Sequence, residues 1–531
     1  MSASRATLAG LTGLILLAGC MVGPDYQRPA APSAPAYKEQ QGIWKLAQPQ
    51  DEAPRGPWWS VYQDPLLDKL ERQIDIDNQT IKAAEAAYRD TVAVVQQARS
   101  SLFPSVTGSF SERTSKGAGG AATTTAVPTA GAAAGTATTT LPTGGSQVRS
   151  LFSLSGAASW DLDVWGRIRR ILAGDVASAQ VSAADLAAAR LSAEGALASA
   201  YVQLRVQDEL KQLLDSSAEA YARSLQIVRN QYAMGVVGKS DVAQAETQLY
   251  STQAQAINTG VLRAQLEHSI AVLIGLPPAS FSIEPEALTL SVPEIPAGMP
   301  STLLQRRPDI AAAERQMHAA NEQVGVAIAG YYPDFTISAS VGYSGSVFSR
   351  LIQSPNQFWS VGPAAAMTLL DFGARDAQVK QARALYDQAV ANYRQTVLTS
   401  FQQVEDQLAA LRILAAQAKV EDQAVASARE AEQLIFNQYR AGTVPYTNVV
   451  VAQTAALGNA QTALGIRESR LTASVALLQA LGGGWDAAQL PSQDQLEEFD
   501  PRVVLPFPVR DDAATSPPAA TPAADVNPTA K

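Results

Sequence analysis

The chain contains one helical hairpin twice, and this duplication constrains the fold more than any other feature of the sequence. Three glycines mark each copy, at its start, at its turn and at its end. They are Gly166, Gly235 and Gly275 in the first copy, and Gly373, Gly442 and Gly482 in the second. All three pairs share one offset of 207 residues. Self-similarity of this kind predicts two tandem copies of one structural unit.

The first part of each hairpin is predicted to be a very long helix. From Gly166 to Met234 the chain runs for about 69 residues without a proline, which is roughly 100 Å at about 1.5 Å per residue. Apolar residues between Leu214 and Tyr232 recur at alternate spacings of four and three, the pattern of a coiled coil. A helix of this length needs partner helices along it. We therefore expect bundled helices rather than a thick globular core.

Half-length helices are predicted to complete each bundle. The returning helices run from Asp241 to about Ile274 and from Asn448 to about Leu481. Before the strands, helices are expected from about Leu66 to Arg99 and from Ser301 to Ala329. One helix of each kind, placed end to end, matches the long helix. Each repeat should therefore form a straight rod two helices wide.

Between the first half-length helix and the hairpin, the hydrophobic period changes from helical to two. Two strand pairs are predicted, within residues 104–165 and 333–370. Each strand alternates apolar side chains with small or polar ones, mostly Ser and Thr, as in the run from Phe335 to Ser344. This length and alternation are typical of strands in a transmembrane barrel. A soluble half-buried sheet alternates too, so the prediction depends on four such strands at matching places in two repeats.

The first strand pair is 22 residues longer than the second, and the excess lies in the tract from Lys116 to Ser146. This tract consists mainly of Gly, Ala and Thr and cannot form a core. We expect a mobile loop at the strand tips, facing the exterior.

Four strands cannot close a transmembrane sheet, because an open edge leaves unpaired peptide groups in lipid. About eight strands are the practical minimum. Two chains would give about eight strands with little or no lumen, whereas three would give about twelve and an open pore. The barrel must therefore be shared between chains, and the helical rods would continue it as a tube.

Cys20 is the only cysteine in the chain, and its setting predicts a lipid anchor. Arg5 and the apolar run from Leu8 to Ala18 form a secretory signal that is too short to span a membrane. The small residues before Cys20 resemble a lipoprotein cleavage site, which implies removal of residues 1–19 and acylation of the thiol. The alternative is a plain signal peptide and a free cysteine. Met21 stands where an aspartate would retain a lipoprotein at the inner membrane, so the outer membrane is expected.

The remaining segments complete the predicted domain organisation. Residues 20–57 are rich in proline and are expected to form the lipidated tether. The first repeat covers 58–275, a linker around the middle of the rod covers 276–300, and the second repeat covers 301–485. The acidic and then Pro/Ala-rich residues 486–531 are predicted to be a disordered tail.

Composition argues against several classes of function. The net charge is −9 and no basic stretch offers a site for nucleic acid. The two histidines, His268 and His318, lie in different repeats and in no ligand-spaced cluster. Asp161 and Asp163 are attributed to barrel-lumen charge rather than acid–base chemistry, and no phosphate loop or nucleophile motif is present. We expect no enzyme activity, no metal and no cofactor apart from the lipid on Cys20.

Several short motifs spread over the chain resemble those of the outer membrane factors, the TolC-like proteins, and most closely their lipoprotein branch. They are Cys20 followed by Gly23-Pro24-Asp25-Tyr26-Gln27-Arg28-Pro29, then Trp58-Trp59, Asp64-Pro65-Leu66, Arg306-Arg307-Pro308-Asp309, Leu370-Asp371-Phe372-Gly373, Tyr439 to Thr443, and Leu481-Gly482-Gly483-Gly484-Trp485. Together they span the folded part of the chain.

The resemblance implies a mainly α fold with membrane β: a trimeric 12-stranded transmembrane β-barrel, four strands per chain, continued by a long α-helical periplasmic barrel. It implies an outer membrane channel that serves as the exit duct of a tripartite efflux pump for drugs or other small molecules. The implied partners are two further copies of the chain, a periplasmic adaptor, an inner-membrane pump of the resistance-nodulation-division type, and outer membrane lipid.

The hairpin turns, Gly235 to Ser240 and Gly442 to Thr447, are expected at the end of the rod away from the barrel. Both glycines suit helix ends that need a positive φ. Asp241 either caps the returning helix, with Gln244 three residues on, or lines the pore mouth. In the family these turns constrict the resting channel and meet the adaptor when it opens.

The resemblance also implies a role for Tyr439, which matches a tyrosine that braces the closed aperture. The sequence departs from the family where an arginine and two aspartates are common. Val444, Asn448 and Val451 stand there, so a charged latch is not expected. The candidate gate residues are Tyr232, Gly235, Asp241, Tyr439, Gly442, Asn448 and Val451, with Val451 forming part of an apolar collar.

Two other functions fit parts of the sequence. A structural lipoprotein, acting as a coiled-coil spacer or surface adhesin without conduction, would explain the rods but not four lipid-facing strands. A diffusion porin would explain the strands but not rods of this length.

Overall fold

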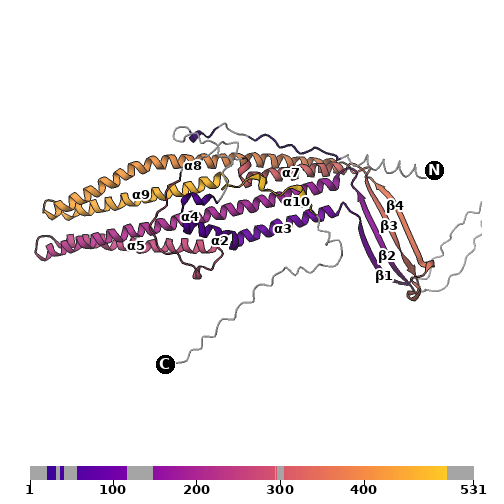
Figure 1. Ribbon diagram of the computed structural model, residues 1–531, viewed down its shortest axis with the longest axis horizontal. Helices are drawn as coiled ribbons and strands as arrows, with labels where there is room; N and C mark the ends of the chain where they lie inside the picture. The colour runs from indigo at the N-terminus through magenta and orange to yellow at the C-terminus, as the bar shows by residue number, and fades with distance from the viewer. Residues whose placement is uncertain are drawn as a thin grey trace, which may run out of the picture.

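In the computed structural model the chain forms a long helical rod with a four-stranded sheet at one end, set at an angle to the rod (Figure 1). The structure describes residues 21–31, 36–40, 57–116, 148–293, 295 and 304–498. The two hairpin turns lie at the opposite end of the rod from the sheet (Figure 1).

The two repeats have helices of matching length. In the first repeat they are α2 (Pro65–Asp77), α3 (Gln79–Ser100), α4 (Arg167–Ala233) and α5 (Lys239–Leu273); in the second they are α7 (Pro308–Ala329), α8 (Ala374–Arg440) and α9 (Tyr446–Ala480). The helices α4 and α8 each have 67 residues, α5 and α9 each have 35, and α3 and α7 each have 22. The prediction that each repeat combines one long helix with half-length helices is confirmed, and the two repeats pack together into a single rod.

The end-to-end junction of the half-length helices explains the third pair of repeated glycines. Asn78 donates from Nδ2 to the carbonyl oxygen of Leu273, 2.7 Å away, at the end of α5. In the second repeat Arg307 donates to the carbonyl oxygen of Ala480, 3.1 Å away, at the end of α9. A Cβ added to Gly275 would lie 2.3 Å from the carbonyl oxygen of Asp77, so no larger residue fits there.

The predicted helix from Leu66 to Arg99 is wrong in one respect, because it is broken at Asn78. The backbone of Asn78 is extended, and its Oδ1 accepts from the amides of Thr80 and Ile81. Asparagine stabilises such a helix start by satisfying two amides that lack helical partners. The second repeat breaks at the equivalent place, Arg307, immediately before Pro308.

The sheet consists of β1 (Ser105–Lys116), β2 (Val148–Leu162), β3 (Asp334–Gly345) and β4 (Gln357–Ala366), antiparallel and in chain order. The register places the apolar set of every strand on one face. Phe110 pairs with Leu154, and Leu154 with Tyr343. The other face carries Ser and Thr hydroxyls, some of which pair across strands, as in the Ser340 to Ser360 contact of 2.8 Å.

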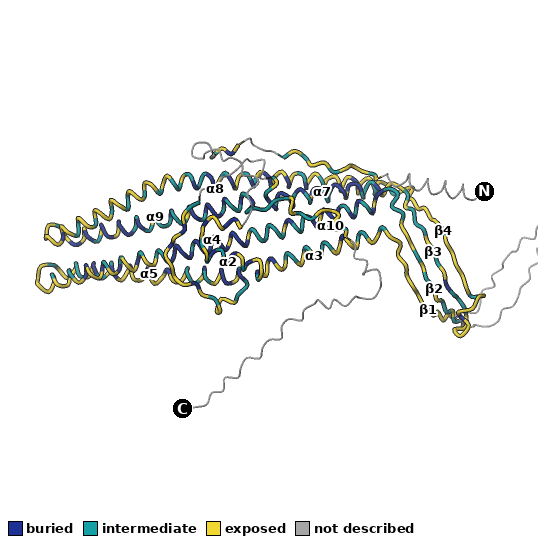
Figure 2. Tube along the Cα trace, in the orientation of Figure 1, coloured by how far each residue is buried: buried dark blue, intermediate teal, exposed yellow. Residues whose placement is uncertain are grey.

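Both faces of this sheet are open in the single chain (Figure 2). Val106 and Trp359, on the apolar face, are 79% and 73% exposed. Such an apolar face in a protein would be unstable in water and fits contact with lipid. No helix in the described part of the chain has the length and apolar character needed to cross a membrane.

The linker between the repeats packs against the rod. Ile283, Leu288 and Leu290 are buried in the core cluster that also holds Trp58 and Tyr201. Arg467 of α9 donates to the carbonyl oxygens of Leu288 and Leu290, each 3.0 Å away. The linker therefore holds α4 and α9 together at the middle of the rod.

Two terminal segments are more ordered than the sequence predicts. Residues 21–31 of the predicted tether lie along the rod, with Tyr26 bonded to Glu314 and Arg28 to Tyr393. The predicted disorder of 486–531 is wrong for 486–498, where α10 (Gln493–Leu496) buries Leu496 against α3 and α4. Single buried side chains in short segments give no periodicity to read. Residues 499–531 and the Lys116 to Ser146 loop, apart from Lys116 itself, lie outside the described residues.

A buried carboxyl pair near the start of the first repeat makes stability depend on pH. Glu71 is 0% exposed, and neither oxygen has a hydrogen-bond partner. Burial, with the nearby Glu194 carboxylate, raises the pKa of Glu71 to about 10. Burial also raises the pKa of Glu194 to about 7, although the hydrogen bond from Trp58 acts to lower it. Glu71 is therefore favoured in the neutral form at pH 7, whereas Glu194 loses its proton around neutral pH.

We expect the Glu71→Gln variant to be more stable than the natural chain above neutral pH. The folded state binds more protons than the unfolded chain between the ordinary glutamate pKa and about 10, so stability is present at low pH and falls as pH rises through this window. Each additional proton bound by the folded state changes the free energy of unfolding by about 1.4 kcal/mol per pH unit. Between pH 6 and pH 8, the free energy of unfolding should fall by less for Glu71→Gln than for the natural chain. An equal loss would contradict a buried, neutral Glu71, and exposed Glu219→Gln serves as the control.

Candidate gate at the hairpin tips

The two hairpin turns have the same backbone geometry. Gly235 has φ +75° and Gly442 has φ +74°. The amide of Gly235 bonds to the carbonyl of Tyr232, and the amide of Gly442 to that of Tyr439, each at 2.9 Å. This left-handed residue ends α4 and α8 and satisfies carbonyls that the helix leaves open. A side chain at either glycine would be strained whatever the space around it.

Tyr439 joins the two hairpins at their tips. It lies in the last turn of α8, is only 4% exposed, and donates its hydroxyl to Oε1 of Gln231 on α4 at 2.5 Å. Its ring packs edge-on against Tyr446 of α9, with 5.2 Å between ring centroids. The ring of Tyr439 therefore packs within the second hairpin, and its hydroxyl bonds to the first hairpin.

Burial keeps this tyrosine pair neutral. It raises the pKa of Tyr439, with a smaller effect from the Asp241 carboxylate, and raises the pKa of Tyr446 to about 12. The hydroxyl of Tyr439 thus remains a hydrogen-bond donor at physiological pH.

Further contacts join the hairpins behind the tip. Thr447 bonds to Gln244 at 3.3 Å, and Tyr221 donates to the carbonyl of Gln453 at 3.2 Å. Leu225, Val228 and Val449 are buried in the same cluster as Tyr439. The contact between α4 and α9 is thus apolar inside and polar at its mouth.

The other predicted gate residues are placed differently. Tyr232 is 47% exposed, Asn448 is exposed and Val451 is 64% exposed, and none of them belongs to the apolar cluster that contains Tyr439. Val444 is half-buried in the tip cluster, where the family's arginine would stand. The side-chain contact between the two hairpins at their tips is therefore a neutral Tyr–Gln hydrogen bond beside an apolar cluster.

The capping role considered for Asp241 is wrong. Helix α5 begins at Lys239, its N-cap is Gly238, and no side chain caps it. Asp241 lies in the first turn, half-buried, with Ser240 Oγ 3.3 Å from its Oδ1. A carboxylate there is favoured by the helix dipole rather than by a cap bond.

The structure reveals a second site that the sequence did not indicate, at the junction of rod and sheet. Arg170 of α4 is 1% exposed and bonds to Glu322 of α7 at 2.8 Å. Its other nitrogens bond to the carbonyl oxygens of Val22 and Gly23, 2.8 and 3.1 Å away. The segment that directly follows Cys20 is thus fixed beside the sheet. Cys20 itself lies outside the described residues.

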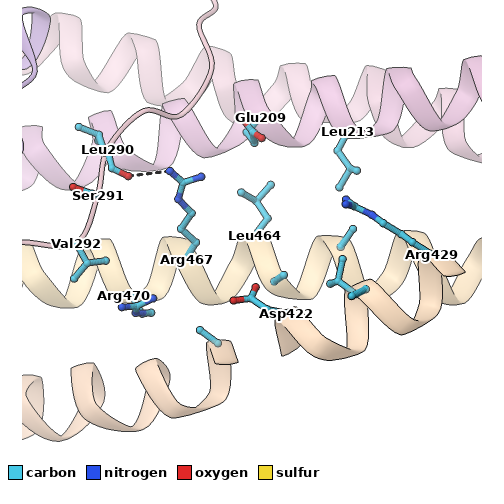
Figure 3. A pocket seen from close by; sticks show the side chains of 15 residues that line it. Glu209, Leu213, Leu290, Ser291, Val292, Asp422, Arg429, Leu464, Arg467 and Arg470 are labelled. Carbon is cyan, nitrogen blue, oxygen red and sulfur yellow. Dashed lines mark hydrogen bonds between the residues drawn. The ribbon is translucent and has the colours of Figure 1, made fainter. Parts of the chain in front are cut away.

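A pocket of about 690 Å³ lies at the middle of the rod, between α4, α8, α9 and the linker. Its lining is mostly apolar, as at Leu464, and also carries charged side chains, including Arg429, Arg467, Asp422 and Glu209 (Figure 3). The hydrogen bond from Arg467 to the carbonyl oxygen of Leu290 joins two residues that line the pocket (Figure 3). Within the described ranges, no group of three or more His, Cys, Asp and Glu side chains could hold a metal ion.

The two histidines differ in their surroundings: His268 on α5 is exposed, and His318 on α7 is half-buried. His318 stacks on Tyr26, with 4.4 Å between ring centroids, and burial lowers its pKa. It lies 3.6 Å from Glu322, the partner of Arg170. It therefore supports the segment that runs along α7.

A model of the outer membrane efflux protein family matches residues 72–276 and 299–483, one segment in each repeat. Among curated relatives, the probable efflux pump outer membrane protein TtgC of Pseudomonas putida is 29% identical over 481 residues, covering 88% of this chain and 94% of that protein. The cation efflux system protein CusC of Escherichia coli is 25% identical, covering 89% and 97%.

Solved structures give the same result. The outer-membrane channel OprN is 27% identical and has a TM-score of 0.77, covering 88% of this chain and all of that one. The Campylobacter jejuni outer membrane channel CmeC, at 22% identity and a TM-score of 0.79, shows the shared fold alone. The predicted fold class is confirmed: two helical repeats with four strands per chain, in the manner of trimeric outer membrane channels with a periplasmic helical barrel. The chain therefore belongs to the outer membrane efflux protein family.

Proposed function

We propose that this chain forms the exit duct of a tripartite pump, with a periplasmic adaptor and an inner-membrane pump of the resistance-nodulation-division type as its partners. Three copies would close the sheet into a barrel of about twelve strands, since four strands leave two open edges in lipid. The rods would continue the barrel into the periplasm, with the hairpin tips towards the adaptor.

The observation that carries this proposal is the join at Tyr439 and Gln231. A tube that must stay shut until a pump engages it needs a contact at its inner end that is stable but reversible. One neutral hydrogen bond on a small apolar cluster has that character, because such a bond contributes only about 1 kcal/mol.

The relatives' names indicate candidate cargoes: toluene and other solvents, antibiotics, and cations. A strain that lacks this chain should become sensitive to at least one of these classes, and re-expression should restore resistance. A chain that restores envelope integrity without restoring export would instead favour the non-conducting structural lipoprotein. We propose no catalytic activity, since every named relative above is a channel or pump component.

We further propose that Cys20 carries the lipid that anchors the chain in the outer membrane. The supporting observation is that Arg170 binds the backbone of Val22 and Gly23, two and three residues after Cys20 in the sequence, at the end of the rod that carries the sheet. The Cys20→Ser variant should retain its signal peptide or lose its acyl mass, and should reach the outer membrane at reduced level. Mass spectrometry of the N-terminal peptide decides this, and an unmodified Cys20 in the natural chain would refute the proposal.

A further inference from the structure

Each hairpin carries both partners of the tip bond, although a single chain uses only one set. Within the chain, Tyr439 of the second hairpin donates to Gln231 of the first. At the repeat offset of 207 residues, Tyr232 is the position equivalent to Tyr439, and Gln438 is the position equivalent to Gln231. The first hairpin therefore also has the donor, and the second also has the acceptor.

The second set is free in the single chain. Tyr232 is 47% exposed, against 4% for Tyr439, and makes no hydrogen bond to any described residue through its side chain. Gln438 is exposed, one residue before the buried Tyr439. The same chemistry is thus buried on one side of the hairpin pair and open on the other.

The apolar surfaces behind the tip show the same difference. Tyr250 and Ile257 on α5 are 57% and 78% exposed, and Val420 on α8 is 68% exposed. Their counterparts 207 residues away are Leu457, Leu464 and Leu213, which pack in the core clusters of the rod. The open faces of α5 and α8 therefore repeat the two faces by which α9 and α4 contact each other.

A ring of identical chains closes only if the last open face meets the first. Since each chain offers an α8 face resembling α4 and an α5 face resembling α9, we infer that α5 of one chain packs on α8 of the next, and that Tyr232 donates its hydroxyl to Gln438 of the partner subunit. This inference rests on the proposed function only in requiring a closed ring of hairpins. The Tyr232–Gln438 bond would be a neutral contact between chains, at tips where Val444, Asn448 and Val451 stand in place of charged residues.

The contact between the two hairpins of one chain and the contact between neighbouring chains would not be equally strong. Tyr439 packs against Tyr446, but the residue that matches Tyr446 in the first hairpin is Lys239, which is exposed. Lysine cannot give the edge-on ring contact that supports the tyrosine within the chain. The bond between chains would therefore be better solvated and easier to break than the bond within a chain.

Thiol cross-linking tests the inferred pair directly. Cys20 is the only natural cysteine, so the helical rod contains no thiol that could compete with the introduced ones for the cross-linker. The double variant Tyr232→Cys/Gln438→Cys, treated in outer membrane vesicles with a short bis-methanethiosulfonate, should give covalent dimers and trimers on denaturing gels. The double variant Gln231→Cys/Tyr439→Cys should give cross-linked monomers only.

A matched control moves one thiol along the same helix. Glu430 is exposed and lies eight residues before Gln438, roughly 12 Å along α8 at about 1.5 Å per residue. The pair Tyr232→Cys/Glu430→Cys should give no ladder. A ladder as strong as that of the test pair, or no ladder from the test pair in a sample whose native mass is that of a trimer, would overturn the inference. A monomeric native mass would instead refute the proposed function.

Removing single hydroxyls gives an independent measurement. Tyr232→Phe should raise the open fraction of single channels by about two- to tenfold, the range expected for one hydrogen bond. Tyr439→Phe should act in the same direction. An effect of Tyr439→Phe with none from Tyr232→Phe would show that the hydroxyl of Tyr232 makes no bond in the closed channel.

Discussion

Channels of the Tyr439→Ala variant should open at least about tenfold more often than those of the natural protein. The substitution removes the only side-chain bond from Tyr439 to the first hairpin and a ring that is 4% exposed in the tip cluster. A hydrogen bond of about 1 kcal/mol and a partial loss of apolar contact together exceed the roughly 1.4 kcal/mol that corresponds to a factor of ten. The measurement is the open probability of purified channels in planar bilayers.

The direction of this effect follows from which contacts survive opening. The Tyr439–Tyr446 contact lies within the second hairpin and can persist when the hairpins part, whereas the bond to Gln231 cannot. Gln231→Ala should therefore raise the open probability too, by less than Tyr439→Ala. Tyr88→Ala, which removes a partly buried ring from α3 far from the tips, is the matched control and should leave gating unchanged. Equal gating of Tyr439→Ala and the control would contradict the assigned brace.

The largest loss of stability is expected from Arg170→Met. Arg170 and Glu322 are 1% and 5% exposed at their side chains, and their ion pair closes at 2.8 Å. Removing the cation leaves a buried carboxylate without its charge partner, which costs about 3–5 kcal/mol. It also frees the carbonyl oxygens of Val22 and Gly23. We expect a much lower midpoint of denaturation and new proteolysis in the segment after Cys20.

A second substitution separates the charge from the packing. Arg170→Met/Glu322→Gln removes both charges and should recover most of the lost stability, because a buried ion pair contributes less than either of its members costs alone. The N-terminal segment should stay susceptible to protease in the double variant, since its carbonyls still lack their donor. If the double variant is no more stable than Arg170→Met, the ion pair is not what Arg170 contributes.

Periodicity accounts for the parts of the fold that could be predicted from the sequence. The long helices, their half-length partners and the strands each repeat a spacing many times, and the duplication presents every spacing twice. The turns were readable from Gly235 and Gly442, because a positive φ at a helix end strongly favours glycine. These signals are local, so one sequence is enough.

The contacts that define the candidate gate and the anchor could not be read in this way. Tyr439 and Gln231 are 208 positions apart, and Arg170 and Glu322 are 152 apart. No pattern in either neighbourhood names the partner, and Arg170 is one of many charged residues on a long helix. The break at Asn78 was missed because an asparagine N-cap without a proline resembles continuous helix.

The native mass and the single-channel conductance of the mature protein, measured on one preparation, test the central claim most directly. The account predicts a trimer with small and infrequent openings in planar bilayers, because the tips hold the duct shut in the absence of an adaptor. A monomer that never conducts, with intact helices, would contradict it and would leave the non-conducting envelope lipoprotein as the function of this chain.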